Sequence, residues 1–300
     1  MNYVVAVDVG GTEIKSALVD SDLNVIATKN ISTPRSDVTG VETVDAIKTI
    51  VSEFAQYQTI AAVGLVVPGT LDESTGTSRW AGNLQWKNLA IRDMLSAAID
   101  TPVAFSHDVR TAAVAEMRNG AAKGALNAIF IPVGTGIAAA LIIEGEIRSV
   151  EGFAGEIGHV SVNGKYPCVC GKTGCLEAAS STLAISKAYE LASGKTGVTT
   201  EEIYKLVVTG DLIAMQVWND ATSAIARMCE VLITILAPEV IVFGGGLSNA
   251  GQTLLKPIQD YLDSSLTFQR KPRLEIAHYK SQAGTIGCAM LAFDLVKGGK

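Results

Sequence analysis

The stretch Tyr3–Ser32, YVVAVDVGGTEIKSALVDSDLNVIATKNIS, decides the fold because three β-like runs follow one another within it. The runs are Tyr3–Asp8, Ile14–Val19 and Val25–Ser32, and the turns between them carry glycine, Asp or Asn. Strands connected by such short turns pair in the antiparallel sense. The chain is therefore predicted to open with a three-stranded antiparallel sheet.

Helices and strands alternate after this opening. The apolar spacing predicts helices over 41–54, 91–98 and 110–117, with strands over 60–67 and 103–106. This alternation is typical of a parallel extension of the sheet.

The second half repeats the order of the first. Closely spaced strands are expected over 129–133, 137–143 and 146–149, followed by helices and by two further strands over 240–243 and 273–277. The pattern predicts a duplicated α/β architecture with a cleft between the halves. We expect a small domain over 1–109 and a larger one over 110–300, with the last helix, 284–296, packing back on the first domain.

Composition sets the class of protein. With 300 residues and 48% hydrophobic residues, the chain can bury a substantial core. Its net charge of -6 disfavours nonspecific attraction to nucleic acid or to anionic membranes. Its apolar runs are interrupted by proline, glycine or charge before they reach spanning length, so no membrane helix is expected. A strand-like run follows Met1 almost at once, without a basic leader and apolar core, and we expect a cytoplasmic protein.

A cluster of sulfur and nitrogen ligands lies in Glu151–Ala178, EGFAGEIGHVSVNGKYPCVCGKTGCLEA. His159, Cys168, Cys170 and Cys175 form the donor set of a closed tetrahedral zinc site. Glycines at 171 and 174 permit the tight turns that aim three sulfurs at one point. A disulfide or packed free thiols are the alternatives, and five cysteines cannot all pair. We interpret the segment as a structural zinc insertion.

Glycine-rich loops occupy equivalent positions in both halves. Glycine lets backbone N–H groups approach phosphate, threonine adds a donor, Lys15 can neutralise charge and Asp8 can hold Mg²⁺. Either loop alone could be an ordinary hairpin turn. A third loop links a strand to a helix and could accept the adenosine or be merely a tight turn. The candidate residues for binding Mg-ATP are Asp8, Gly10, Gly11, Thr12, Lys15, Gly134, Thr135, Gly136, Gly244, Gly245 and Gly246.

Together these motifs resemble the ROK family of bacterial sugar kinases and related repressors, within the actin and hexokinase superfamily of ATPases. The likeness covers nearly the whole chain. It is carried by the Asp8–Lys15 loop, Pro68-Gly69, Gly82-Asn83-Leu84, Asp108 at a helix start, Glu156-Ile-Gly-His159 and the segment from Cys168 to Glu177. The resemblance implies two actin-like, ribonuclease H-like domains, zinc on the His and Cys set, transfer of the ATP γ-phosphoryl group to a hexose, and a homodimer or homotetramer.

The resemblance also implies roles for single residues. Asp108 would be the general base, although a carboxylate at a helix start can simply be a cap. Family kinases usually carry Asn immediately before this Asp, whereas this chain has His107, which could contact substrate or pack in the core. The other candidates for sugar binding could instead be solvent-exposed carboxylates or turn residues. The predicted sugar-binding set is Gly69, Asn83, His107, Asp108, Glu156, His159 and Glu177.

Three functions are open at this point. The first is an ATP-dependent hexokinase, with glucose favoured and N-acetylmannosamine or N-acetylglucosamine as the alternative sugar. The second is a sugar-sensing regulator, but only seven residues precede Asp8, where family repressors carry a helix-turn-helix reader. The third is a catalytically silent binding protein, which the intact Asp8, Lys15 and Asp108 disfavour.

Overall fold

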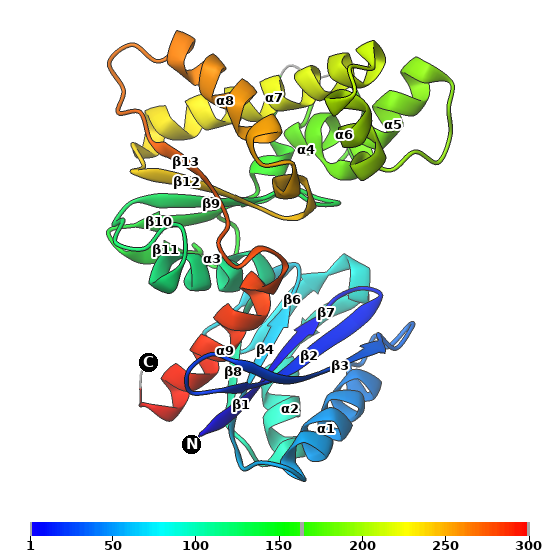
Figure 1. Ribbon diagram of the computed structural model, residues 1–300. Helices are drawn as coiled ribbons and strands as arrows, with labels where there is room; N and C mark the ends of the chain where they lie inside the picture. The colour runs from blue at the N-terminus through cyan, green and yellow to red at the C-terminus, as the bar shows by residue number, and fades with distance from the viewer. Residues whose placement is uncertain (1, 163–164, 299–300) are drawn as a thin grey trace. The chain divides into compact units, whose positions relative to one another are not determined.

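A computed structural model describes residues 2–162 and 165–298 of the chain (Figure 1). The chain folds into two compact units. The first contains the residues up to 118, residues 149–153 and the residues from 282 onward, and the second contains 119–148 and 154–281. Each unit is built around its own five-stranded sheet.

The sheet of the first unit has the strand order β3-β2-β1-β4-β8. The first three strands pair antiparallel, and β4 and β8 continue the sheet in parallel. The bounds are β1 Tyr3–Val9, β2 Glu13–Asp20, β3 Val25–Ser32, β4 Ile60–Val67 and β8 Val103–His107. The predicted antiparallel opening and parallel extension are both confirmed.

Helices cover both faces of this sheet because its central strands are apolar on both sides. Val5 and Val7 face the core under α1 (Val41–Ala55) and α2 (Ile91–Ile99). Val4 and Ala6 face α9 (Ala283–Val296), as the alternation of side chains along a strand requires. Helix α3 (Asp108–Asn119) lies against α9, where a Cβ on Gly287 would meet the carbonyl oxygen of Thr111 at 1.9 Å.

The second unit repeats the first. Its sheet has the order β11-β10-β9-β12-β13, again with three antiparallel strands followed by two parallel ones. The bounds are β9 Ala128–Pro132, β10 Ala140–Ile143, β11 Glu146–Arg148, β12 Val240–Gly244 and β13 Arg273–Ile276. The matching strand orders confirm the predicted duplication of an α/β architecture.

A helical layer packs on the second sheet around one large apolar core. Its centre is the 25-residue helix α7 (Leu212–Leu236), which α8 (Gln252–Ser265) packs against. The other helices of the layer are α4 Leu176–Ser180, α5 Thr182–Ser193 and α6 Thr200–Val208. No helix within residues 2–162 and 165–298 is long and apolar enough to cross a membrane.

Two local features differ from the predictions. A small sheet of β5 (Thr70–Asp72), β6 (Thr77–Ala81) and β7 (Trp86–Leu89) was not foreseen. The predicted strand over 137–143 is shorter, since β10 begins at Ala140, and the N–H of Ala139 instead bonds the carbonyl of Gly155 at 2.8 Å.

The last helix belongs to the first unit. Helix α9 packs on β1 and β4, and a Cβ on Gly64 of β4 would lie 2.5 Å from the Cys288 sulfur. Helix α3 also falls in this unit, where the sequence led us to expect a division after residue 109. The short stretch 149–153 joins it as well.

Candidate active site and metal centre

The turn between β1 and β2 holds the first predicted phosphate loop. The N–H of Gly10 donates to the carbonyl of Glu13 at 2.9 Å, and the Thr33 hydroxyl donates to the carbonyl of Gly10 at 2.6 Å. Asp8 and Lys15 are partners across the antiparallel ladder. The loop is therefore fixed at its base, while Gly11 and Thr12 are exposed.

The sugar-binding candidates Gly69 and Asn83 lie near this loop in the first unit. A Cβ on Gly11 would come within 2.9 Å of the Asn83 Cβ, so the loop touches the short helix η1 (Gly82–Leu84). Gly69 has a φ of 100°, and a Cβ there would lie 2.2 Å from the carbonyl oxygen of Trp80. Only glycine fits at this position, which joins β4 to the small sheet.

Asp108 begins α3 directly after β8 ends at His107. The N–H of Val109 donates to Asp108 Oδ1 at 2.7 Å and also to His107 Nδ1 at 3.2 Å. Asp108 keeps 43% of its side-chain surface exposed, yet the surrounding protein removes enough solvent to raise the pKa of its carboxyl. The Val109 N–H and the Arg110 guanidinium oppose that rise in pKa.

Asp108 influences Asp8. The pKa of Asp8 is raised to about 6, chiefly by burial and also by the negative charge of Asp108, while Lys15 acts in the opposite direction. The strand ends of the first unit thus bring together two carboxylates that the sequence placed one hundred residues apart. Such paired carboxylates are typical of catalytic or cation-binding sites.

Glu73 and Arg110 belong to this cluster and were not predicted. Glu73 follows β5 and accepts hydrogen bonds from the Ser106 hydroxyl at 2.6 Å and the His107 N–H at 3.1 Å. Its Oε1 also lies 3.3 Å from Nε of Arg110, a side chain that is only 6% exposed. Neither residue carries a local motif, because each contact joins segments more than thirty residues apart.

The two glycine loops of the second unit lie against each other. The Val133 N–H donates to the carbonyl of Gly244 at 3.0 Å, and the Leu247 N–H donates to the carbonyl of Val133 at 3.1 Å. These bonds place the predicted phosphate loop Gly134, Thr135 and Gly136 beside the predicted adenosine loop Gly244, Gly245 and Gly246.

A cavity of about 660 Å³ adjoins the Gly246 end of this pair. Tyr204 and Trp218 contribute aromatic surface to it, with ring centroids 5.9 Å apart. Its wall is formed by α5, α6, α7 and the short helix η3 (Gly246–Ala250). The sequence indicated the glycines but not this wall, since no short motif links helices that are separated along the chain.

Gly245 is expected to be intolerant of any side chain. Its φ is 74°, and a Cβ would lie 2.4 Å from the carbonyl oxygen of Val133. We expect Gly245→Ala to lower the free energy of unfolding by at least about 2 kcal/mol, measured by chemical denaturation. The matched control is Gly246→Ala, where a Cβ meets no atom within 4 Å. Equal stability of the two variants would contradict this conformational requirement.

Glu177 bonds the backbone beside the second predicted phosphate loop. Its Oε2 accepts the N–H of Ile137 at 2.9 Å and would lie 2.9 Å from a Cβ on Gly136. Gly158 packs against the same segment, where a Cβ would meet the Ile137 carbonyl oxygen at 2.2 Å. The sugar candidates Glu177 and His159 therefore lie close to the phosphate loop, and Glu156 is exposed just before η2 (Ile157–His159).

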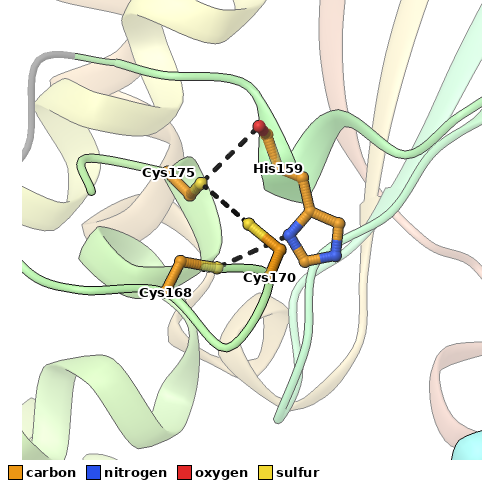
Figure 2. Close-up of side chains that lie close together, drawn as sticks. All are labelled: His159, Cys168, Cys170 and Cys175. Atoms are coloured by element: carbon orange, nitrogen blue, oxygen red, sulfur yellow. Dashed lines mark hydrogen bonds between the residues drawn. The ribbon is translucent and has the colours of Figure 1, made fainter. Parts of the chain in front are cut away.

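The predicted metal ligands converge in the structure (Figure 2). One ligand atom from each of His159, Cys168, Cys170 and Cys175 lies within 4.8 Å of all the others. His159 Nδ1 is 3.5 Å from Cys168 Sγ, and Cys170 Sγ is 3.6 Å from Cys175 Sγ. All five cysteines are free thiols in this structure.

The spacing of these atoms fits a tetrahedral zinc ion. Zinc–sulfur bonds of about 2.3 Å set neighbouring sulfurs about 3.8 Å apart around a tetrahedral ion. The 3.6 Å separation of Cys170 and Cys175 is close to that edge length. Gly171 and Gly174 have φ angles of 88° and 86°, as the predicted tight turns require.

A sequence model of the ROK family matches residues 4–294. The chain belongs to the ROK family. A "Glucokinase" of Halalkalibacterium halodurans is 34% identical over 95% of this chain and 93% of that protein. An "N-acetylmannosamine kinase" of Pasteurella multocida is 28% identical over 98% of this chain and 97% of that protein. The predicted family is thereby confirmed.

Solved ROK structures share the fold. A ROK family glucokinase from Streptomyces griseus, crystallised with glucose and AMPPNP, superposes with a TM-score of 0.83 at 26% identity. The match covers 97% of this chain and 99% of that chain. The predicted fold class is confirmed by this likeness.

Proposed function

We propose that the protein is a ROK sugar kinase that transfers the γ-phosphoryl group of ATP to a hexose hydroxyl. The observation that carries the proposal is the pairing of Asp108 and Asp8 at the strand ends of the first unit. Phosphoryl transfer requires a base at the attacking hydroxyl and a cation at the phosphates. Two carboxylates with different surroundings can divide these tasks.

Asp108 is assigned as the general base. It starts a helix, its backbone is held by β8 and α3, and its pKa is raised by burial toward the pH at which it would work. Asp8 is assigned to the Mg²⁺ that accompanies ATP, with Lys15 as a neighbouring positive charge. The ion would supply positive charge to the phosphates, and the backbone of Gly10, Gly11 and Thr12 would hold the phosphate chain.

The second unit is assigned to the nucleotide. The 660 Å³ cavity begins at Gly246, beside the loop that carries Gly134, Thr135 and Gly136. Aromatic and apolar walls suit a purine base, while exposed glycine N–H groups suit its phosphates. The cleft between the two halves of the chain remains a prediction.

Glucose is the favoured sugar. Support comes from the glucokinase relative at 34% identity and from the glucokinase structure that holds glucose. Gly69, Asn83, His107, Asp108, Glu156, His159 and Glu177 are the proposed contacts. N-acetylmannosamine or N-acetylglucosamine is the alternative, and the N-acetylmannosamine kinase relative supports it.

Zinc is proposed for the His159, Cys168, Cys170 and Cys175 site, where the donor set is closed and leaves no open position for a reaction. Its role would be structural, since Glu177 follows Cys175 by two residues and bonds the phosphate-loop backbone. A homodimer or homotetramer is also proposed from the family resemblance.

An ADP-release assay with Mg-ATP tests the proposed activity. We expect turnover with glucose and at least about tenfold lower kcat/KM with N-acetylmannosamine, N-acetylglucosamine, mannose, fructose and allose, because wrong hydroxyl geometry leaves polar groups unpaired. If an acetamido sugar gives a higher kcat/KM than glucose does, that sugar and not glucose is the preferred substrate. Sugar binding by calorimetry without any turnover would favour a sugar-sensing regulator.

A further inference from the structure

One carboxylate oxygen binds the chain on both sides of Asp108. Oε1 of Glu73 accepts the Ser106 hydroxyl at 2.6 Å and the His107 N–H at 3.1 Å. The same oxygen accepts the Nε–H of Arg110 at 3.3 Å. Ser106 and His107 end β8, whereas Arg110 belongs to the first turn of α3. A single atom of Glu73 therefore holds residues that precede and follow the proposed base.

Local hydrogen bonds hold the Asp108 carboxylate against its own neighbours. The Val109 N–H donates to Asp108 Oδ1 at 2.7 Å and to His107 Nδ1 at 3.2 Å. Because these bonds join adjacent residues, they fix the carboxylate only relative to the nearby backbone. Glu73 fixes that backbone relative to the rest of the first unit, since it follows β5 and is more than thirty residues away in the chain.

Burial makes the contacts of Glu73 unfavourable to lose. The Arg110 side chain is 6% exposed and that of Glu73 is 29% exposed. The buried Nη2 of Arg110 has no hydrogen-bond partner within residues 2–162 and 165–298, and Glu73 supplies a counter-charge to this guanidinium. Ser106 and His107 are buried as well, so their donors would also be left unpaired without Glu73.

We propose that Glu73 is a positioning residue for the general base, holding the junction of β8 and α3 so that the Asp108 carboxylate meets the attacking hydroxyl. This inference rests on the proposed kinase function. Glu73 itself exchanges no proton with the substrate. Since a displacement of about 1 Å can lower a rate by about 100-fold, loss of these bonds should affect kcat much more than sugar binding.

Two substitutions of similar size test this role. Glu73→Met removes the acceptor, whereas Glu73→Gln keeps an oxygen for Ser106 and His107. We expect kcat to fall by at least about 30-fold in Glu73→Met and by at most about fivefold in Glu73→Gln, with the sugar KM within about threefold of the parent value in both. A kcat of Glu73→Met within about threefold of the parent value overturns the proposal, as does an equal loss in both variants.

A double variant separates positioning from charge balance. Glu73→Met with Arg110→Met removes both charges, and apolar replacement of a buried ion pair often leaves folding intact. We expect it to keep the low kcat of Glu73→Met, because Ser106 and His107 still lack their acceptor. Recovery of the parental kcat would show that only the unpaired charge of Arg110 mattered, and would overturn the proposal. If Glu73→Met does not fold, the double variant replaces it in each measurement.

Hydrogen–deuterium exchange without substrate tests the bonds independently of activity. We expect the His107 amide to exchange at least about tenfold faster in Glu73→Met than in the parent, while the amides of α1 keep their rates. Unchanged exchange at His107 overturns the proposal even if the parent phosphorylates a sugar. Faster exchange together with a parent that phosphorylates no sugar rejects the kinase function, and the positioning role with it, while the hydrogen bonds of Glu73 stand.

Discussion

Asp108→Asn is expected to lower kcat by at least about 1,000-fold, since general-base catalysis typically contributes between about 100- and 10,000-fold. The amide has almost the shape of the carboxylate but cannot accept the hydroxyl proton. Asn can still accept the Val109 N–H through its oxygen, so the start of α3 should remain folded. An ADP-release assay at saturating sugar and Mg-ATP measures the effect.

Sugar binding separates a lost base from a damaged fold. Calorimetry should give a sugar Kd for Asp108→Asn within about threefold of the parent value, because most proposed contacts remain. Asp93→Asn is the matched control, since Asp93 is exposed on α2 outside the cluster. If kcat of Asp108→Asn stays within tenfold of the parent value, Asp108 is not the general base.

The elements that the sequence identified are those with strong local patterns. Tyr3–Val7 and Ile60–Val67 are unbroken apolar runs that the structure buries in the centre of a sheet. The repeat of short-turned strands in both halves predicted the duplicated sheet order. The candidate metal-binding set was visible because its four members lie within seventeen residues of one another.

The elements that escaped prediction depend on contacts far apart in the chain. Strands β5, β6 and β7 have only three to five residues each, in a stretch rich in Thr, Ser and Gly. Trp86 is buried there in the core of the first unit, and its indole N–H donates to the Asp37 carbonyl at 2.8 Å, across 49 residues. Glu73 likewise finds its partners on β8 and α3. Such pairing is determined by the fold and leaves no periodic signal.

Cys170→Ser is expected to lower zinc affinity by at least about 100-fold and to lower the melting temperature of the protein. Removal of one thiolate opens the tetrahedral site, and zinc that binds only the folded site contributes its binding free energy to folding. The change should reach the proposed sugar site, because α4 begins directly after Cys175 and carries Glu177. Elemental analysis after dialysis against a chelator gives the zinc content, and a thermal scan gives the melting temperature.

Val169→Ser is the matched control for the loop itself. Val169 lies between Cys168 and Cys170 with 93% of its surface exposed, and it is not one of the four ligands. This variant should retain one zinc per chain and the parent melting temperature, since an exposed side chain contributes little to stability. Sugar affinity by calorimetry should fall in Cys170→Ser and stay unchanged in Val169→Ser. Stoichiometric zinc together with parental sugar affinity in Cys170→Ser would show that Cys170 is not a zinc ligand, because a ligand cannot be removed without weakening the ion it holds.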